Sequence, residues 1–319
     1  MKRKEDESMR KEIFVFTGFG GVKLPAILWL PDGEPRRILQ ITHGMTEHIG
    51  RYEALAENLT AQGIAVAGYA LRGHGQNPGN PDVASFGEGG WEASLEDMHL
   101  FFEHLSARFP GVPHDMLGFS LGSFLLREYL GKWSDGVSST IIMGTGNQPG
   151  FVLSIMMAIV KGQIKKGGFD NTTDIVRQLS FGTYNQKFKP NRTASDWLCA
   201  DAKQLDDYIA DPLCRKDISS GLFRQLLDAM KRTGGKNACG AWRKDMPVLL
   251  ISGKDDPVGD MGKGVESVKK QLDDTGMKHV SMHLLPGARH IVLSEKACGA
   301  ADQAYGIIED WLKFHAVSK

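Results

Sequence analysis

The chain has 319 residues with a formal net charge of zero, 41% hydrophobic residues and 24% charged residues. This balance is typical of a globular protein, and it argues against a disordered chain or a nucleic-acid-binding protein. No apolar run approaches the roughly 20 residues that span a bilayer. The charged N-terminal stretch is not followed by an apolar segment, so we expect no signal peptide and a cytoplasmic protein.

The four cysteines, Cys199, Cys214, Cys239 and Cys298, are scattered along the chain without a C-x-x-C pair. This spacing is typical of free thiols in a reducing compartment and not of a disulfide framework or a zinc site. We therefore expect neither a disulfide framework nor a zinc site.

Strand-like and helix-like segments alternate over the first 146 residues. Strands are predicted over 12–17, 24–30, 37–42, 64–71, 116–119 and 140–143, and helices over 52–62, 91–109 and 121–133. This order predicts an α/β fold with a mostly parallel sheet that is covered by helices on both faces.

The alternation stops between about residues 147 and 240, where no clean strand is found. It returns with strands over 247–252 and 279–285 and helices over 262–272 and 301–314. We therefore predict an α/β core made of residues 1–146 and 241–319, interrupted by a helical insertion of residues 147–240.

The pentapeptide G-F-S-L-G, residues 118–122, lies where a strand is expected to end and a helix to begin. The hydroxyl of Ser120 is a weak nucleophile by itself and needs a neighbouring base, which in turn needs a carboxylate to orient it. Because G-x-S-x-G is common by chance, the chain must also supply an acid and then a histidine at the ends of later strands.

Both partners are present in that order. Asp255 and Asp256 follow the strand over 247–252, and we favour Asp256, because a residue before proline is held extended at the loop tip. A solvated turn that begins a helix is the alternative interpretation of the two acids. His290 directly follows the next strand. Ser120, Asp256 and His290 are therefore the predicted catalytic triad.

An oxyanion hole needs two backbone N–H groups that point to the place where negative charge develops. Leu121, which follows the predicted nucleophile, is expected to supply one of them. Met45, in the loop after the strand over 37–42, is expected to supply the other, and Gly44 lets the backbone approach closely. An ordinary turn would explain His43-Gly44 equally well.

Together these motifs resemble the α/β-hydrolase superfamily, and within it the monoacylglycerol lipase and lysophospholipase branch, also grouped as serine aminopeptidase-like hydrolases. The resemblance rests on H-G-M-T-E-H-I-G-R-Y (43–52), R-G-H-G (72–75), G-F-S-L-G (118–122), G-K-D-D-P-V (253–258) and A-R-H (288–290). It implies the same triad, the same two oxyanion donors, and a position for Glu47 and Arg51 near the polar head of the substrate. An i,i+4 ion pair would account for Glu47 and Arg51 as well.

The chain departs from the usual pattern of this branch at two positions, with Ala70 in place of an aspartate and Asn77 in place of a serine. Two strings in the insertion, R-T-A-S-D-W-L (192–198) and D-Y-I-A-D-P-L-C (207–214), look like cap motifs of bacterial members. No chemistry is assigned to them.

The resemblance also implies that the insertion is a cap over the active site. Residues 151–160 are apolar around most of a helix, and such a helix is expected to be buried or to contact lipid. We favour a lid wall for an acyl chain, with Phe151, Ile155 and Ile159 as substrate contacts. Transient contact with a membrane surface and simple packing of the cap onto the core are the alternatives.

The sequence thus predicts a serine hydrolase that acts on a small-molecule acyl ester such as a monoacylglycerol or a lysophospholipid. The predicted hydrolytic mechanism requires no metal or cofactor. A thioesterase, an amidase or an aminopeptidase would use the same triad, because fold and triad do not fix the leaving group. A binding protein on the same fold is disfavoured, because all three triad residues are present.

Overall fold

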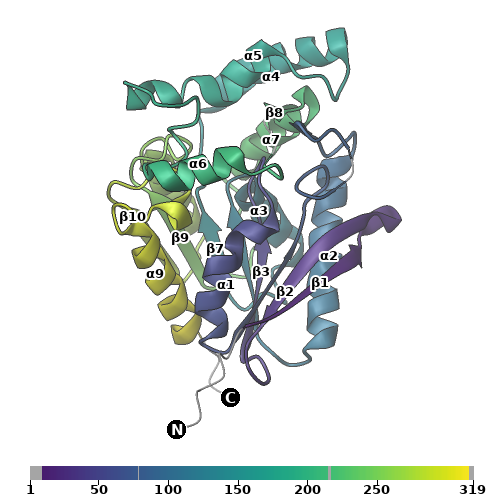
Figure 1. Ribbon diagram of the computed structural model, residues 1–319, viewed down its shortest axis with the longest axis vertical. Helices are drawn as coiled ribbons and strands as arrows, with labels where there is room; N and C mark the ends of the chain where they lie inside the picture. Colours follow the sequence, from purple (N-terminus) through teal and green to yellow (C-terminus); the bar gives the residue numbers. More distant parts are fainter. Residues whose placement is uncertain (1–8, 78, 215–216, 316–319) are drawn as a thin grey trace.

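The computed structural model describes residues 9–77, 79–214 and 217–315. Its main sheet has eight strands in the order β1-β2-β4-β3-β6-β7-β9-β10 (Figure 1). The β1–β2 and β2–β4 pairs are antiparallel, and the other neighbours pair parallel. The strands are β1 (Arg10–Thr17), β2 (Lys23–Leu30), β3 (Arg37–Thr42), β4 (Ile64–Tyr69), β6 (His114–Phe119), β7 (Thr140–Met143), β9 (Val248–Gly253) and β10 (Val280–Leu285).

Helices cover both faces of the sheet, as the sequence predicts. Apolar residues of α1 (Glu53–Thr60) and α9 (Ala300–Phe314) pack on one face. Those of α2 (Gly90–Arg108), α3 (Leu121–Trp133) and α8 (Lys263–Asp274) pack on the other. The central strands β3, β4, β6 and β9 are buried along their whole length, which explains why they read as continuous apolar runs.

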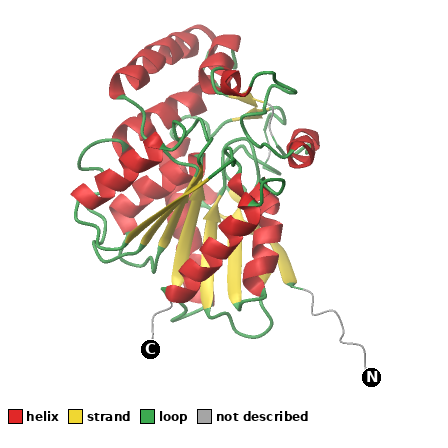
Figure 2. Ribbon diagram, turned by 90° about the vertical axis from the view of Figure 1, so that its left-hand side faces the viewer, coloured by secondary structure: helices red, strands yellow, loops and turns green. Residues whose placement is uncertain are grey.

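The segment between β7 and β9 lies at one end of the sheet (Figure 2). It contains α4 (Gly150–Gly167), α5 (Asp174–Arg177), α6 (Ala202–Ala210) and α7 (Ser220–Thr233). Helix α7 packs against both α3 and α4, so it joins this segment to the helix that follows G-F-S-L-G. A two-residue strand, β8 (Asp217–Ile218), pairs with β5 (Val83–Ala84), and its shortness explains why the sequence predicts no strand there.

The expected strands and helices of the α/β part are present, with ends that differ by a few residues at most. Among the described residues, no helix combines the length and apolarity needed to cross a bilayer. All four cysteines carry free thiols, as their spacing predicts.

Candidate active site

Ser120 lies in a tight turn between β6 and α3. Its backbone has φ 51° and ψ −116°, in a region that non-glycine residues rarely adopt. The flanking glycines allow this turn, because a Cβ at Gly122 would lie 2.1 Å from the carbonyl oxygen of Thr42, and one at Gly118 would lie 2.4 Å from that of Gly122. The turn raises the serine hydroxyl above the carboxyl ends of the parallel strands.

His290 lies between the serine and a buried carboxylate. Its Nε2 is 2.9 Å from Ser120 Oγ, and its Nδ1 is 2.9 Å from Asp256 Oδ2. The Asp256 side chain is fully buried, and its other oxygen accepts the N–H of Val258 at 2.8 Å. Asp256 and not Asp255 is therefore the acid that reaches the histidine. The structure brings the three predicted residues together in the hydrogen-bonded order of a Ser-His-Asp triad.

The loop after β3 is held by His43, whose ring is buried. The N–H of Leu71 donates to His43 Nε2 at 3.0 Å, which places the ring proton on Nδ1, and Nδ1 donates to the carbonyl oxygen of Gly44 at 2.8 Å. That carbonyl and the N–H of Met45 belong to one trans peptide, so fixing the first fixes the direction of the second. Burial, and secondly the neighbouring His74, lower the pKa of His43 well below 6.5.

The two predicted oxyanion donors both lie beside the serine. Met45 lines the same cavity as Ser120, and Leu121 begins α3 directly after it. Within the described part of the chain, neither backbone N–H donates to another protein atom. Leu121 is also the first residue of its helix, where the helix dipole favours negative charge.

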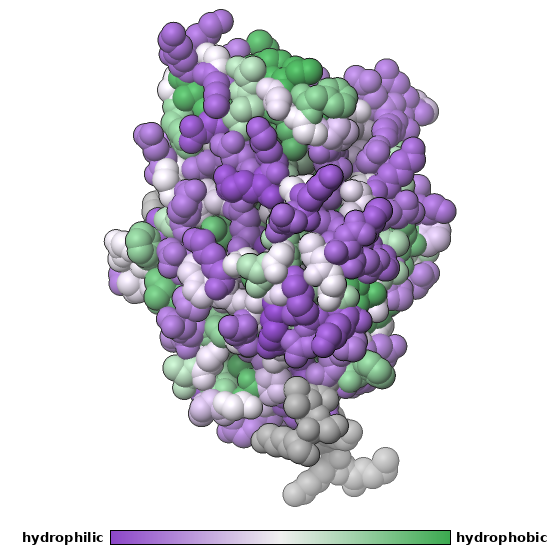
Figure 3. Space-filling view, turned by 180° about the vertical axis from the view of Figure 1, so that it is seen from behind, coloured by the Kyte–Doolittle hydropathy of each residue, from purple (hydrophilic) through white to green (hydrophobic). Residues whose placement is uncertain are grey.

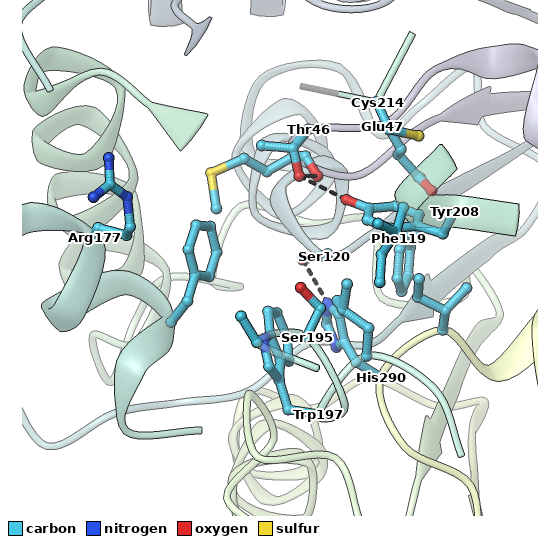
Figure 4. A pocket seen from close by; sticks show the side chains of 16 residues that line it. Thr46, Glu47, Phe119, Ser120, Arg177, Ser195, Trp197, Tyr208, Cys214 and His290 are labelled. Carbon is cyan, nitrogen blue, oxygen red and sulfur yellow. Dashed lines mark hydrogen bonds between the residues drawn. The ribbon is translucent and has the colours of Figure 1, made fainter. Parts of the chain in front are cut away.

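A cavity of about 260 Å³ opens above Ser120 and His290 (Figure 4). The core supplies one side of it, and residues of the insertion supply the other. Its walls are mostly apolar or aromatic, with Trp197 at 5.3 Å and Phe119 at 4.9 Å from the His290 ring. The lining residues from the insertion are Arg177, Phe181, Ala194, Ser195, Trp197, Leu198, Tyr208, Ile209 and Cys214.

Of the two residues expected near the polar head of the substrate, Glu47 lines the cavity above Ser120 and Arg51 does not. Glu47 lines the cavity but is buried, and its Oε1 accepts the Gly44 N–H and the Tyr52 hydroxyl, both at 2.8 Å. Arg51 lies behind it and lines a smaller neighbouring cavity. Its Nε is 3.5 Å from Glu47 Oε2. The i,i+4 pair that the sequence left as an alternative is therefore present, and Glu47 also supports the loop that carries Met45.

The predicted acyl-chain contacts Phe151, Ile155 and Ile159 require a correction. They lie on α4 but do not line the cavity, and their exposed fractions are 72%, 60% and 36%. Helix α4 packs mainly on α7 through a narrow stripe that buries only Leu153 and Val160 of its residues. The sequence pattern predicts apolarity around the helix but not which face another element covers. The cavity walls come instead from the end of α5, the π-helical turn Gln178–Gly182 that follows it, α6 and the loops of the insertion.

Sequence reasoning missed Glu295. Its buried carboxylate accepts the N–H of Arg289, directly before His290, at 2.8 Å, and the N–H of Ala200, in the insertion, at 2.9 Å. The Ile291 N–H, directly after His290, donates to the carbonyl oxygen of Leu198 at 2.7 Å. The loop of the histidine is thus bound to the insertion on both sides. An acid five residues after the histidine carries no signal for this role in a single sequence.

Asn77, one of the two departures from the usual pattern, has a local structural role. Its side-chain amide donates to the carbonyl oxygens of Ala70 at 2.8 Å and Leu71 at 2.7 Å. It thereby closes the R-G-H-G turn against the strand end, next to the N–H of Leu71 that holds His43.

Comparison with known proteins places the chain in a family. A sequence model described as serine aminopeptidase, S33 matches residues 33–297, which include Ser120, Asp256 and His290. The chain belongs to this family. Among curated relatives, monoacylglycerol lipase of Mycolicibacterium smegmatis is 23% identical, and the match covers 88% of this chain and 90% of the relative. Monoglyceride lipase of Mus musculus is 28% identical, with 84% and 83% covered.

Solved structures confirm the α/β-hydrolase fold. A thermostable carboxyl esterase from Bacillus coagulans superposes with a TM-score of 0.85 at 24% identity, and the match covers 97% of this chain and all of that one. A soluble variant of monoglyceride lipase from Saccharomyces cerevisiae superposes with a TM-score of 0.75 at 19% identity, and the match covers 99% of both chains.

Proposed function

We propose that this protein is a serine hydrolase of lipid-like carboxylic esters such as monoacylglycerols or lysophospholipids. The observation that carries the proposal is the pair of 2.9 Å contacts that join Ser120, His290 and Asp256 at the floor of an apolar cavity. The family membership and the names of the lipase relatives support the same substrate class.

The proposed reaction begins when His290 Nε2 takes the proton of Ser120 and Oγ attacks the ester carbonyl. Asp256 holds the imidazole and stabilises its cation. The N–H groups of Met45 and Leu121 stabilise the tetrahedral oxyanion. His290 then protonates the leaving alcohol, activates water against the acyl-enzyme, and returns the proton to the serine when the acid leaves.

We propose further that residues 147–240 act as a cap, called the cap from here on. Two of its parts support this role. Aromatic side chains of Phe181, Trp197 and Tyr208 form cavity walls opposite the core. Figure 3 shows apolar surface at the cap end of the molecule, and α4 contributes exposed apolar side chains there, Phe151, Ile155 and Ile159. With Lys161, Lys165 and Lys166 beyond them, they suit transient contact with a lipid surface.

Labelling with a fluorophosphonate probe tests the mechanism. Wild type is expected to react at Ser120, and Ser120→Ala to lose the label together with at least about 10⁴-fold of its ester hydrolysis. Ser195→Ala, which removes another hydroxyl from the same cavity, is the matched control and should keep the label. Labelling that persists in Ser120→Ala would refute the proposed nucleophile, and ligand binding without hydrolysis in wild type would favour a binding protein.

A substrate panel tests the bond that is cleaved. A monoacylglycerol, a lysophospholipid, a p-nitrophenyl ester, an acyl thioester and an aminoacyl anilide would be compared by kcat/KM. We expect the esters to be the better substrates, because the cavity is lined mostly by apolar groups. Anilide turnover well above ester turnover would overturn the ester assignment.

We also propose that the protein works in a reducing compartment, the cytoplasm, which its four free thiols favour.

A further inference from the structure

The tetrapeptide Asp211-Pro212-Leu213-Cys214, which the proposed reaction does not use, forms a β-turn after α6. The N–H of Cys214 donates to the carbonyl oxygen of Asp211 at 3.1 Å. Aspartate in the first position and proline in the second favour this turn. The N–H of Leu213 donates to Asp211 Oδ1 at 2.9 Å. The other carboxylate oxygen is directed to the core.

The core residue that meets this turn is His48, which lies 163 positions earlier in the chain. Its Nε2 is 2.8 Å from Asp211 Oδ2. The imidazole nitrogen, the carboxylate oxygen and the Cys214 sulfur all lie within 4.8 Å of one another. The ring of His48 is confined, because a Cβ at Gly50 would lie 3.0 Å from its Nδ1 and one at Gly75 would lie 2.8 Å from its Cβ. Three metal-binding groups thus meet where the cap contacts the core.

Their chemistry selects a class of cation. Thiolate and imidazole favour zinc-like ions over Mg²⁺ or Ca²⁺, and a carboxylate is an accepted third ligand. Tetrahedral coordination at ordinary zinc–ligand lengths separates donor atoms by about 3.4–3.6 Å. The His48–Asp211 pair, at 2.8 Å, would open by about half an ångström to reach that spacing, and the sulfur, which lies within 4.8 Å of both, would approach them by at most about 1.3 Å.

The surrounding charges favour a divalent ion. Among the described residues, the carboxylates of Glu47 and Asp211 interact with the Cys214 side chain, and Arg51 pairs with Glu47 at 3.5 Å. These carboxylates offer compensating negative charge to a divalent cation bound between His48, Asp211 and Cys214. A metal ion binds cysteine as the thiolate, so binding at this site would release the thiol proton.

We propose that His48, Asp211 and Cys214 form a binding site for a thiophilic divalent cation, with Zn²⁺ as the expected ion. The site ties the cap to the loop that also carries Met45, three residues before His48. Cys214 and Tyr208 also line the cavity (Figure 4), so a bound ion would restrain the cap wall beside the substrate. Zn²⁺ should therefore inhibit hydrolysis. This consequence rests on the proposed function, whereas binding of the ion does not.

Cobalt spectroscopy tests the site directly, because tetrahedral Co²⁺ bound by a thiolate gives intense visible bands and a sulfur-to-metal charge-transfer band. Chelator-treated wild type should bind one Co²⁺ per chain, and Zn²⁺ should displace it. Cys214→Ser should lose the charge-transfer band. His48→Asn and Asp211→Asn should weaken Co²⁺ binding at least about tenfold. Far-UV circular dichroism and urea midpoints would establish that each variant is folded.

Two controls separate the site from its surroundings. Cys298→Ser removes the exposed cysteine and should leave the cobalt spectrum unchanged. Ser120→Ala should also bind Co²⁺ like wild type, which keeps metal binding distinguishable from hydrolysis. A wild type without the charge-transfer band, or a band that survives in Cys214→Ser, would overturn the site. Equal inhibition of wild type and Cys214→Ser by Zn²⁺ would overturn its effect on the reaction.

Discussion

Two stretches of the cap, α4 and residues 196–201, contact the rest of the molecule in opposite ways. Helix α4 is long and apolar, yet it buries only one stripe, against α7. Residues 196–201 form no regular element, yet they are bonded to the loop of His290 through Leu198, Ala200 and the side chain of Glu295. Arg289 adds a further bond, from its guanidinium to the carbonyl oxygen of Asp196 at 2.5 Å.

The difference shows that the hydrophobicity of a cap segment does not determine how firmly that segment is bound to the core. The apolar helix is peripheral, while a short irregular segment is bonded to the loop that carries His290. Trp197 in that segment is only 6% exposed and lies against the ring of His290, so this wall of the cavity should stay with the core even if α4 moves.

The largest expected effect comes from breaking the inner attachment. Glu295→Ala leaves the N–H groups of Arg289 and Ala200 without their acceptor in a buried place. We expect kcat to fall about 100-fold, because small displacements of a catalytic group cost that much. We also expect the free energy of unfolding to fall by about 2–3 kcal/mol.

Steady-state kinetics and urea denaturation would measure both effects. Glu295→Gln keeps one carbonyl oxygen as acceptor and should restore most of kcat, which a general loss of stability would not predict. Glu57→Ala, at an exposed position on α1, is the control for removing a carboxylate. A Glu295→Ala variant with wild-type kcat would show that the inner segment does not position the histidine.

A smaller effect is expected at the outer helix, and only at a lipid surface. Phe151→Ser with Ile155→Ser removes the most exposed apolar groups of α4. Burying one such group is worth about 1.5–3 kcal/mol, so binding to lipid vesicles should weaken at least about tenfold. Hydrolysis of a short water-soluble ester should change less than about twofold, because neither residue lines the cavity.

The matched control is Ile13→Ser with Val15→Ser, on the edge strand β1, where both side chains are equally exposed. Vesicle co-sedimentation and hydrolysis of vesicle-borne substrate would be measured for both pairs. Equal weakening by the two pairs would mean that α4 has no special contact with lipid.

The smallest expected effect is on the pH dependence of stability, through the buried ring of His43 in the core. The folded-state pKa of His43 lies well below 6.5, with burial as the main cause, so folding favours the neutral ring. Its contribution to stability is present above pH 6.5 and is lost as the pH falls toward the folded pKa. One such site should lower the free energy of unfolding by about 1 kcal/mol between pH 6.5 and 5.5. Urea denaturation of wild type should show this extra pH slope relative to His43→Gln, and identical slopes would contradict it.

Sequence could predict the parts that topology fixes. The carboxyl ends of parallel strands meet at one edge of the sheet, so residues after β3, β6, β9 and β10 had to come together there. This is why Ser120, Asp256 and His290 could be named from their order along the chain. Asp256 could be chosen over its neighbour because the proline after it restricts the loop.

The rest depends on contacts that leave no local pattern. Glu295 acts through backbone N–H groups, which every residue type offers. Which face of α4 is exposed depends on where α7 packs against it, and the spacing of apolar residues along α4 does not determine this. His48 and Cys214 lie close together only because the cap folds back on the core. The spacing of the cysteines in the sequence therefore could not predict this contact.

The bond from His43 to the carbonyl oxygen of Gly44 has a consequence for the timing of catalysis. A peptide group at such a position could rotate between two orientations, with either its oxygen or its N–H toward the substrate. Here the oxygen is already engaged, and the Gly44 N–H on the other side of the residue is engaged by Glu47. The Met45 N–H, which we propose as an oxyanion donor, is therefore held in one orientation before any ester arrives, and no free energy of substrate binding would be consumed in turning it.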